Sequence, residues 1–419
     1  MKRKILYLLL AVALLSALCI LFASCGGGGG EKIVLYVYNW GEYIEDGSGT
    51  EDGKSVNDLF EEYCKNELGL NVEVNYSTFS SNEDMYAKID SGAVAYDIII
   101  PSDYMIERMI KNNLIRPLDM TLIPNYQNID ERFKGENVYY ETDAKEGEIY
   151  SVPYFYGMIG VIYNTGIVAE DDEDLGSWSL MWDADYQGDI LQFNNSRDAF
   201  GTALYYLQYD VNEATPEQWK EALELLKAQK SVVQGYVMDE IFNKMKSNSA
   251  AVAAYYAGDY LSMYEDNDSL SFFYPKEGTN SYVDAMCIPA NSKNYELANI
   301  YINFMCSEEI ARMNAEYTYY ASPVTTVVQN EEYREYMESV HEDAMEILYG
   351  EMSTSVQTQA YLDLTPESHT LLNSLWEELK VESSVGVGIY VLCGVIVISL
   401  ILLLVANILR RRRWARLYD

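Results

Sequence analysis

The stretch that decides the fold of this 419-residue chain reads IVLYVYNWGEY and covers residues 33–43. Its first part, residues 33–38, is a run of β-branched and aromatic residues, which is typical of a buried strand. Its second part, residues 39–43, is polar and aromatic and contains a glycine, as loops do. The same order, an apolar run followed by an aromatic and acidic loop, returns along the chain.

Helices and strands alternate after this first strand. Capping residues precede apolar stripes at helical spacing at Ser55 and Asn82, so we expect helices there. Further strands are expected at residues 71–76 and 96–100. This order favours a mainly parallel sheet covered by helices. A second unit of the same kind follows, with strands expected at residues 157–163, 189–193, 250–256 and 286–289.

Five loops at the expected carboxyl ends of strands each contain an aromatic residue, a carboxylate or both: residues 39–43, 102–104, 194–198, 256–259 and 282–284. In open α/β sheets, ligands bind beyond these strand ends. Aromatic faces attract ammonium groups, and carboxylates give them charge-assisted hydrogen bonds. The loops therefore favour a small organic cation as ligand.

The charge agrees with a cationic ligand. The chain has 29 basic and 65 acidic residues. The part between the two ends described next keeps 21 and 64 of them, a net charge of about −43. Such a field excludes nucleic acid and anionic surfaces as partners. The spacing of Cys64, Cys287 and Cys306 supports neither a disulfide framework nor a zinc site, and no cofactor or metal is expected.

Both ends of the chain carry membrane signals. Residues 1–25 have a basic start, an apolar run and small residues before Cys25, as in a lipoprotein signal peptide, with Cys25 as the lipidated residue. Residues 26–30 are glycines that form a tether. Residues 385–409 are long and apolar enough for a transmembrane helix. The arginine-rich residues 410–419 place the tail in the cytoplasm, so the ligand-binding part lies outside the cell.

Several ordered motifs carry a resemblance to a known family, among them YVYNWGEYI (36–44), YDIIIPSDY (96–104) and IPANSKN (288–294). In this respect the chain resembles the spermidine/putrescine-binding proteins of bacterial ABC importers. The match runs from about residue 33 to residue 323, and residues 76–88, 151–157 and 177–188 contribute to it. Each motif is weak alone, but the ordered set is specific.

The resemblance implies a two-lobe, type II periplasmic-binding-protein-like fold with crossing hinge strands, spanning residues 31–384. One lobe is expected at residues 31–152 and 285–330, the other at residues 153–284, with C-terminal helices at residues 331–384. The implied function is capture of a polyamine between the lobes and its presentation to an ABC permease in the same membrane. No catalytic residue is implied.

The resemblance also implies the ligand-binding residues. Trp40 and Tyr43 would stack on the polyamine, Asp198 would bind a terminal amine, and Asp284 an internal or second amine. The full expected set is Trp40, Glu42, Tyr43, Ser102, Tyr104, Asn195, Asp198, Tyr256, Asp259, Tyr282, Asp284 and Tyr320.

Four features depart from the family pattern. Tyr256 and Tyr282 stand where tryptophan is usual, and Asn195 stands where spermidine binders often have aspartate. The resemblance does not place the family's C-terminal glutamine contact in this chain, because the match fades after Pro323. The C-terminal membrane span is also unusual for the family.

Two other readings compete with a polyamine receptor. Paired carboxylates can serve glycoside hydrolysis, but no nucleophile motif or phosphate loop accompanies them. The two histidines, His341 and His369, lie outside the strand-end loops. The second alternative is a binding protein or sensor for another small cationic solute, and the sequence does not choose between spermidine and putrescine.

Overall fold

The computed structural model describes residues 32–350 and 357–381, together with residues 395, 398 and 399. The predicted signal and tether, residues 1–30, lie outside this part, and so does almost all of the predicted span at residues 385–409. Within the described ranges, no helix has the length and apolar character needed to cross a bilayer.

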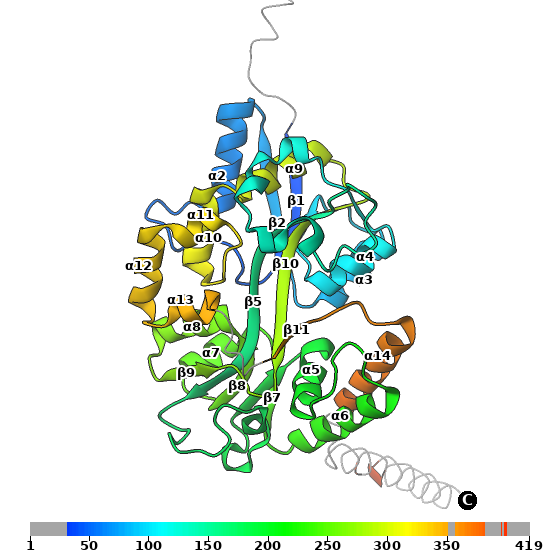
Figure 1. Ribbon diagram of the computed structural model, residues 1–419, viewed down its shortest axis with the longest axis vertical. Helices are drawn as coiled ribbons and strands as arrows, with labels where there is room; N and C mark the ends of the chain where they lie inside the picture. The colour runs from blue at the N-terminus through cyan, green and yellow to red at the C-terminus, as the bar shows by residue number, and fades with distance from the viewer. Residues whose placement is uncertain (1–31, 351–356, 382–394, 396–397, 400–419) are drawn as a thin grey trace, which may run out of the picture.

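The described chain forms two α/β lobes, and two long strands run through both of them (Figure 1). These strands are β5 (Ser151–Asn164) and β10 (Thr279–Pro289). The strand order is β2-β1-β3-β10-β5-β8-β6-β7, with β4 and β11 beside β10 and β9 beside β5. The sheet therefore continues from one lobe into the other through an antiparallel pair.

The first lobe is built on β1 (Ile33–Trp40), which pairs in parallel with β2 (Val72–Phe79) and β3 (Ile98–Ile99). Ser55 and Asp58 form a capping box at the first helix, as the sequence predicts. The other elements of this lobe are α2 (Val56–Tyr63), α3 (Asn82–Asp90), α4 (Asp103–Lys111), β4 (Ile115–Arg116), α9 (Tyr295–Met305) and α10 (Glu308–Thr318).

The second lobe repeats this plan. β6 (Ile190–Phe193) pairs in parallel with β7 (Val233–Val237) and β8 (Val252–Tyr256). Thr215 and Gln218 form a capping box at the start of α6. The remaining elements of this lobe are α5 (Ser196–Tyr206), α6 (Pro216–Gln229), α7 (Glu240–Lys246), α8 (Ala257–Asp266) and β9 (Leu270–Phe273).

The C-terminal region connects the two lobes again. The helices expected at residues 331–384 are found in part, but a strand that the sequence reading missed interrupts them, and it pairs in parallel with residues 279–281 of β10. Helix α14 then packs on α5 and α6 of the second lobe. The elements are α11 (Thr325–Gln329), α12 (Glu331–Val340), α13 (Ala344–Tyr349), β11 (Thr358–Ala360) and α14 (Pro366–Val381).

The expectation of a mainly parallel sheet is right inside each lobe and wrong at the centre. There β5 pairs antiparallel with β10 and β8. Both crossing strands are also longer than the segments expected at residues 157–163 and 286–289. Polar residues such as Asn280 and Asp284 interrupt the apolar pattern that marks a strand, because they line the cavity between the lobes.

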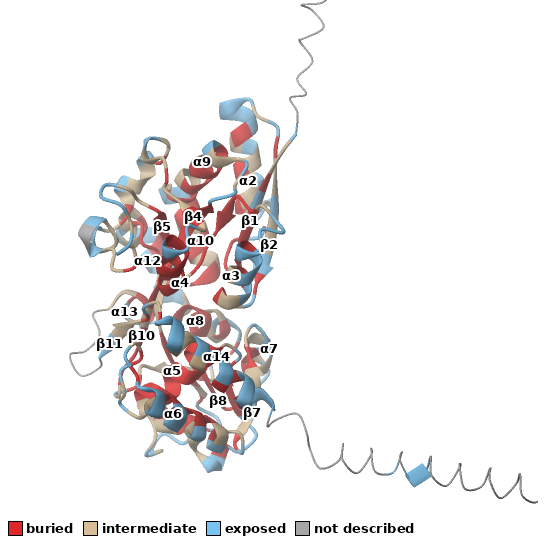
Figure 2. Cartoon of the chain, turned by 90° about the vertical axis from the view of Figure 1, so that its right-hand side faces the viewer, coloured by how far each residue is buried: buried red, intermediate tan, exposed pale blue. Residues whose placement is uncertain are grey.

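Each lobe has a buried interior, as Figure 2 shows. Trp178 and Trp219 are fully buried in the core. Cys64, Cys287 and Cys306 are buried free thiols.

Candidate functional site

A narrow cavity of about 70 Å³ lies between the lobes. Its wall comes from β1, β2, α3 and α4 of the first lobe, from α5, α7, β8 and α8 of the second, and from β10. All twelve residues that the sequence predicts as ligand contacts line this cavity. The structure thus brings together groups that are up to 280 positions apart, from residue 40 to residue 320.

The first lobe contributes an aromatic wall. Trp40 ends β1, and its ring lies 4.5 Å from that of Phe79, centroid to centroid. The two lobes approach each other closely beside Trp40. A Cβ atom added to Gly41 would lie only 2.4 Å from Asp239 Oδ2 of the second lobe. Glu42 follows in the left-handed region, with φ of 49°. Such backbone strain in a non-glycine residue is frequent at binding sites.

Asp284 lies in the middle of the cavity wall. The sequence reading placed residues 282–284 in a strand-end loop, but they lie inside β10. Ser102 Oγ donates to Asp284 Oδ1 at 2.6 Å, and the Tyr43 hydroxyl donates to Oδ2 at 2.7 Å. Burial raises the pKa of Asp284 to about 6, against the lowering effect of these two hydrogen bonds. The carboxylate is therefore held in place by two neutral donors.

Asp198 lies in the first turn of α5. Asn195 caps this helix by accepting from the Asp198 backbone N–H at 2.8 Å, and its amide donates to Asp198 Oδ2 at 2.8 Å. The Tyr256 hydroxyl donates to the same oxygen at 2.7 Å. Burial raises the pKa of Asp198. Asn195 and Tyr256 thus orient a carboxylate that neither of them neutralises.

Asp259 lies in the first turn of α8, on the same side of the cavity. The Tyr320 hydroxyl donates to its Oδ2 at 2.8 Å. Burial is the main cause that raises the pKa of Asp259 to about 8, and the negative charges of Asp239 and Glu42 add to it. This group has fewer hydrogen bonds than the other two carboxylates, so its ionised form is the least stabilised.

None of these three carboxylates forms an ion pair within the described ranges. Arg197 is adjacent in sequence to Asp198, but its guanidinium donates to Val211 O and Asn212 Oδ1. Lys246 pairs with Asp266 instead. The cavity therefore concentrates negative charge, which Arg197 and Lys246 offset only in part and without an ion pair to these carboxylates.

Several lining residues were not predicted. The amide of Asn82 donates to Ser102 Oγ and to the Tyr104 hydroxyl, at 3.0 and 3.2 Å. Tyr361 enters from the segment after β11, where the motif match has already faded. Asn82 begins α3 and Ser81 is its N-cap, so the helix start predicted there was a usable signal for Asn82, whereas no local pattern marks Tyr361. The unpredicted lining residues include Phe79, Ser81, Asn82, Glu83, Asp103, Met238, Asp239, Phe242, Tyr255, Asn280 and Tyr361.

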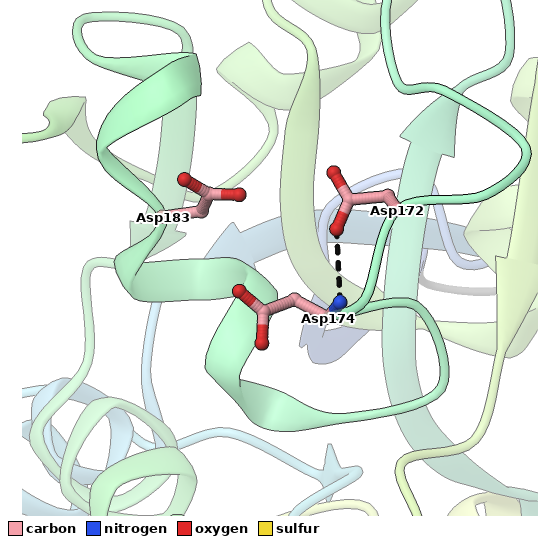
Figure 3. A group of neighbouring side chains, drawn as sticks. All are labelled: Asp172, Asp174 and Asp183. Carbon is pink, nitrogen blue, oxygen red and sulfur yellow. Dashed lines mark hydrogen bonds between the residues drawn. The ribbon is translucent and has the colours of Figure 1, made fainter.

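A separate acidic group, Asp172, Asp174 and Asp183, lies away from the cavity (Figure 3). One carboxylate oxygen of each lies within 4.8 Å of the others, and all three residues are partly exposed. The Asp174 backbone N–H donates to Asp172 Oδ1 at 2.9 Å, so turn geometry accounts for part of the arrangement. Exposed acidic groups of this kind are common without an ion, and we assign no metal site to them.

The comparisons with known proteins identify a family and a fold. A family model of bacterial extracellular solute-binding proteins matches residues 58–340. The spermidine/putrescine-binding periplasmic protein of Salmonella typhimurium is 30% identical over 324 residues, which is 77% of this chain and 85% of that protein. The putrescine/cadaverine-binding protein of Pseudomonas aeruginosa is 27% identical over 356 residues, 83% of this chain and 93% of that protein.

A solved structure agrees with these matches. The spermidine/putrescine ABC transporter substrate-binding protein of Streptococcus pneumoniae superposes with a TM-score of 0.63 at 31% identity. The superposition covers 83% of this chain and 99% of the other. The periplasmic-binding-protein-like fold that the sequence motifs imply is therefore confirmed.

Proposed function

The chain belongs to the family of bacterial extracellular solute-binding proteins, and we propose that it is the polyamine-binding component of an ABC importer. In this role it captures spermidine or putrescine between its lobes and presents it to a permease in the same membrane. The twelve predicted residues form the binding site in this proposal. The Salmonella and Pseudomonas relatives are named for polyamine ligands, and this supports the choice of ligand.

The observation that carries the proposal is a set of three buried carboxylates that form no ion pair within the described part of the chain. Asp198, Asp259 and Asp284 are 8%, 6% and 5% exposed, and each is oriented only by neutral donors. An ammonium group that enters such a site loses water but gains charge-assisted hydrogen bonds. A ligand with several ammonium groups on a thin aliphatic chain matches both the charges and the narrow shape.

Aromatic rings supply the rest of the recognition. Tyr256 and Tyr282 meet edge to face at 5.4 Å, and Tyr43 and Tyr320 at 4.6 Å. Their apolar surfaces cover the methylene groups of a polyamine, and their faces attract its ammonium groups. The lobes close over the ligand by bending in the crossing strands. The closed form is the one that the permease recognises.

Calorimetric titration of residues 31–381 with putrescine, spermidine and a panel of cationic amino acids tests the function. We expect binding of a polyamine and no turnover of polyamines or glycosides. Asp198→Asn should weaken that binding at least tenfold, about 1.4 kcal/mol. Asp268→Asn is a matched control, because it removes the same charge from an exposed position outside the cavity. Preference for another cation in the panel would overturn the choice of ligand.

The membrane anchors complete the proposal. Lipid on Cys25 and a helix at residues 385–409 hold the binding domain on the outer side of the cell membrane, with residues 410–419 in the cytoplasm. The basic start of residues 1–25 and the arginines after residue 409 support this orientation. Cysteines introduced at Gly30 and Tyr418 should label from opposite sides of whole cells. Labelling of both from outside would contradict it.

A further inference from the structure

Strand β10 presents alternate side chains to the cavity. Asn280, Tyr282 and Asp284 all line it, as the two-residue period of a strand requires. The sequence motifs predict Tyr282 and Asp284 as ligand contacts, and they predict no role for Asn280. These three residues form a row that begins in the second lobe, where β10 pairs with β11 at Asn280, and ends where β10 enters the first lobe.

Asn280 differs from Asp284 in its hydrogen bonding. Asn280 is 3% exposed, and its Oδ1 is buried without a hydrogen-bond partner among the described residues. Both oxygens of Asp284, in contrast, already accept from neighbouring hydroxyls. A buried acceptor that stays unsatisfied destabilises a protein, so such a group in a binding cavity points to a donor on the ligand.

We propose that Asn280 Oδ1 accepts an N–H of the ligand and makes the cavity select polyamines by length. This inference rests on the proposed polyamine function. Four residues of a strand span about 13 Å, which separates the backbone positions of Asn280 and Asp284. An extended aliphatic chain advances about 1.2 Å per bond, so the nitrogens of putrescine lie about 6 Å apart and the terminal nitrogens of spermidine about 11 Å apart. Spermidine reaches both ends of the row, and putrescine reaches one.

The neutral carbonyl suits this role. An amide oxygen accepts from an ammonium group without adding another buried negative charge to a cavity that already holds three carboxylates. Asn280 Oδ1 therefore discriminates between ligands by their length, because a ligand too short to reach this oxygen leaves it without a hydrogen bond. The effect of removing Asn280 should grow with the length of the ligand.

The test is calorimetric titration of the wild type, Asn280→Leu and Asn280→Ala with putrescine, spermidine and 1,8-diaminooctane. The last ligand has the length of spermidine without its internal amine. Leucine has nearly the shape of asparagine without an acceptor, and alanine serves if leucine does not fit. We expect each variant to bind spermidine and 1,8-diaminooctane at least tenfold more weakly, and putrescine less than threefold more weakly.

Asn243→Leu is the matched control, because Asn243 is exposed on α7 and does not line the cavity. It should leave all three affinities unchanged. The inference would be overturned if the Asn280 variants lost affinity equally for short and long ligands, or if the folded variants lost no affinity. The proposed function would still stand in that case, as long as the wild type binds a polyamine. Absence of polyamine binding by the wild type would instead overturn the proposed function itself.

Discussion

Asp97 and Asp259 are both buried aspartates, 1% and 6% exposed, but their surroundings differ. Asp97 precedes β3 and accepts five hydrogen bonds, from the Tyr36 N–H, the Ser292 hydroxyl, the Lys293 and Asn294 N–H groups and the Asn294 amide. Asp259 accepts one hydrogen bond, from Tyr320. Burial alone therefore does not distinguish Asp97 from Asp259, the proposed ligand contact, whereas the number of hydrogen-bond donors does.

The difference has a physical reason. The five donors of Asp97 replace the water that the carboxylate loses on folding, so the group joins β1 to the segment after β10 as part of the folded lobe. Asp259 has only one neutral donor and no ion pair within the described ranges, so a positively charged ligand can stabilise its ionised form. Under the proposed function, the buried carboxylates of the cavity lower the stability of the ligand-free protein, and a bound cation should raise it again.

The largest expected effect is the loss of stability on substituting Asp97, the carboxylate with five donors. Asp97→Asn removes the charge and turns an amide toward several donors, so the free energy of unfolding should fall by at least about 3 kcal/mol. Urea denaturation measures this change. Asp259→Asn is the matched variant and should leave the ligand-free protein as stable or more stable. Equal destabilisation by both variants would break the comparison.

Asp284→Asn should have the next largest effect, on affinity rather than stability. It keeps the shape but leaves a buried ammonium without its counter-charge, which costs about 2–5 kcal/mol of binding free energy. Titration with spermidine and putrescine also reveals which amine Asp284 meets. A greater loss for spermidine indicates the internal amine, and equal losses indicate a terminal one. A loss under about 1.4 kcal/mol for both ligands contradicts the site.

Trp40 in the proposed site and Trp219 in the core allow the same comparison for aromatic residues. Trp40→Ala should weaken polyamine binding by about 1–3 kcal/mol, because it removes a stacking face and apolar contact area. Trp219 is 1% exposed in the core of the second lobe, so Trp219→Ala should lower the free energy of unfolding and leave the affinity of the folded protein unchanged. Similar losses of affinity in both folded variants would contradict the assignment.

The smallest predicted effect is the dependence of binding on pH. Burial raises the pKa of Asp259 to about 8 and that of Asp284 to about 6. Between pH of about 4, the ordinary aspartate pKa, and pH 8, the folded ligand-free protein binds more protons than the unfolded chain, so its stability falls as pH rises through this window. A cation favours the ionised carboxylates, so affinity should rise over the same window.

We expect spermidine to bind at least about tenfold more tightly at pH 8 than at pH 5.5. Calorimetry in two buffers of different ionisation enthalpy should detect protons released on binding at pH 6.5. Asp259→Asn should release fewer protons than the wild type. An affinity that is constant over this range would show that the carboxylates are already ionised in the free protein.

Much of the fold was predictable, because its signals are local. The capping residue Ser55 marks a helix start, and it forms a capping box there. Apolar runs mark the short parallel strands. The crossing strands were underestimated because residues that face the cavity, such as Asn280 and Asp284, break the apolar pattern. Strand β11 was missed because it has three residues and depends on its neighbour β10.

The sequence by itself determined the alternation of elements, the acidic character of the chain and the residue types at the strand ends, because periodicity, charge and motif order are properties of neighbours along the chain. Only the tertiary structure decided which carboxylates have donors. Tyr43 reaches Asp284 across 241 positions, and the donors of Asp97 come from residues 36 and 292–294. Desolvation and hydrogen bonding depend on these distant contacts, and they separate Asp97 from Asp259.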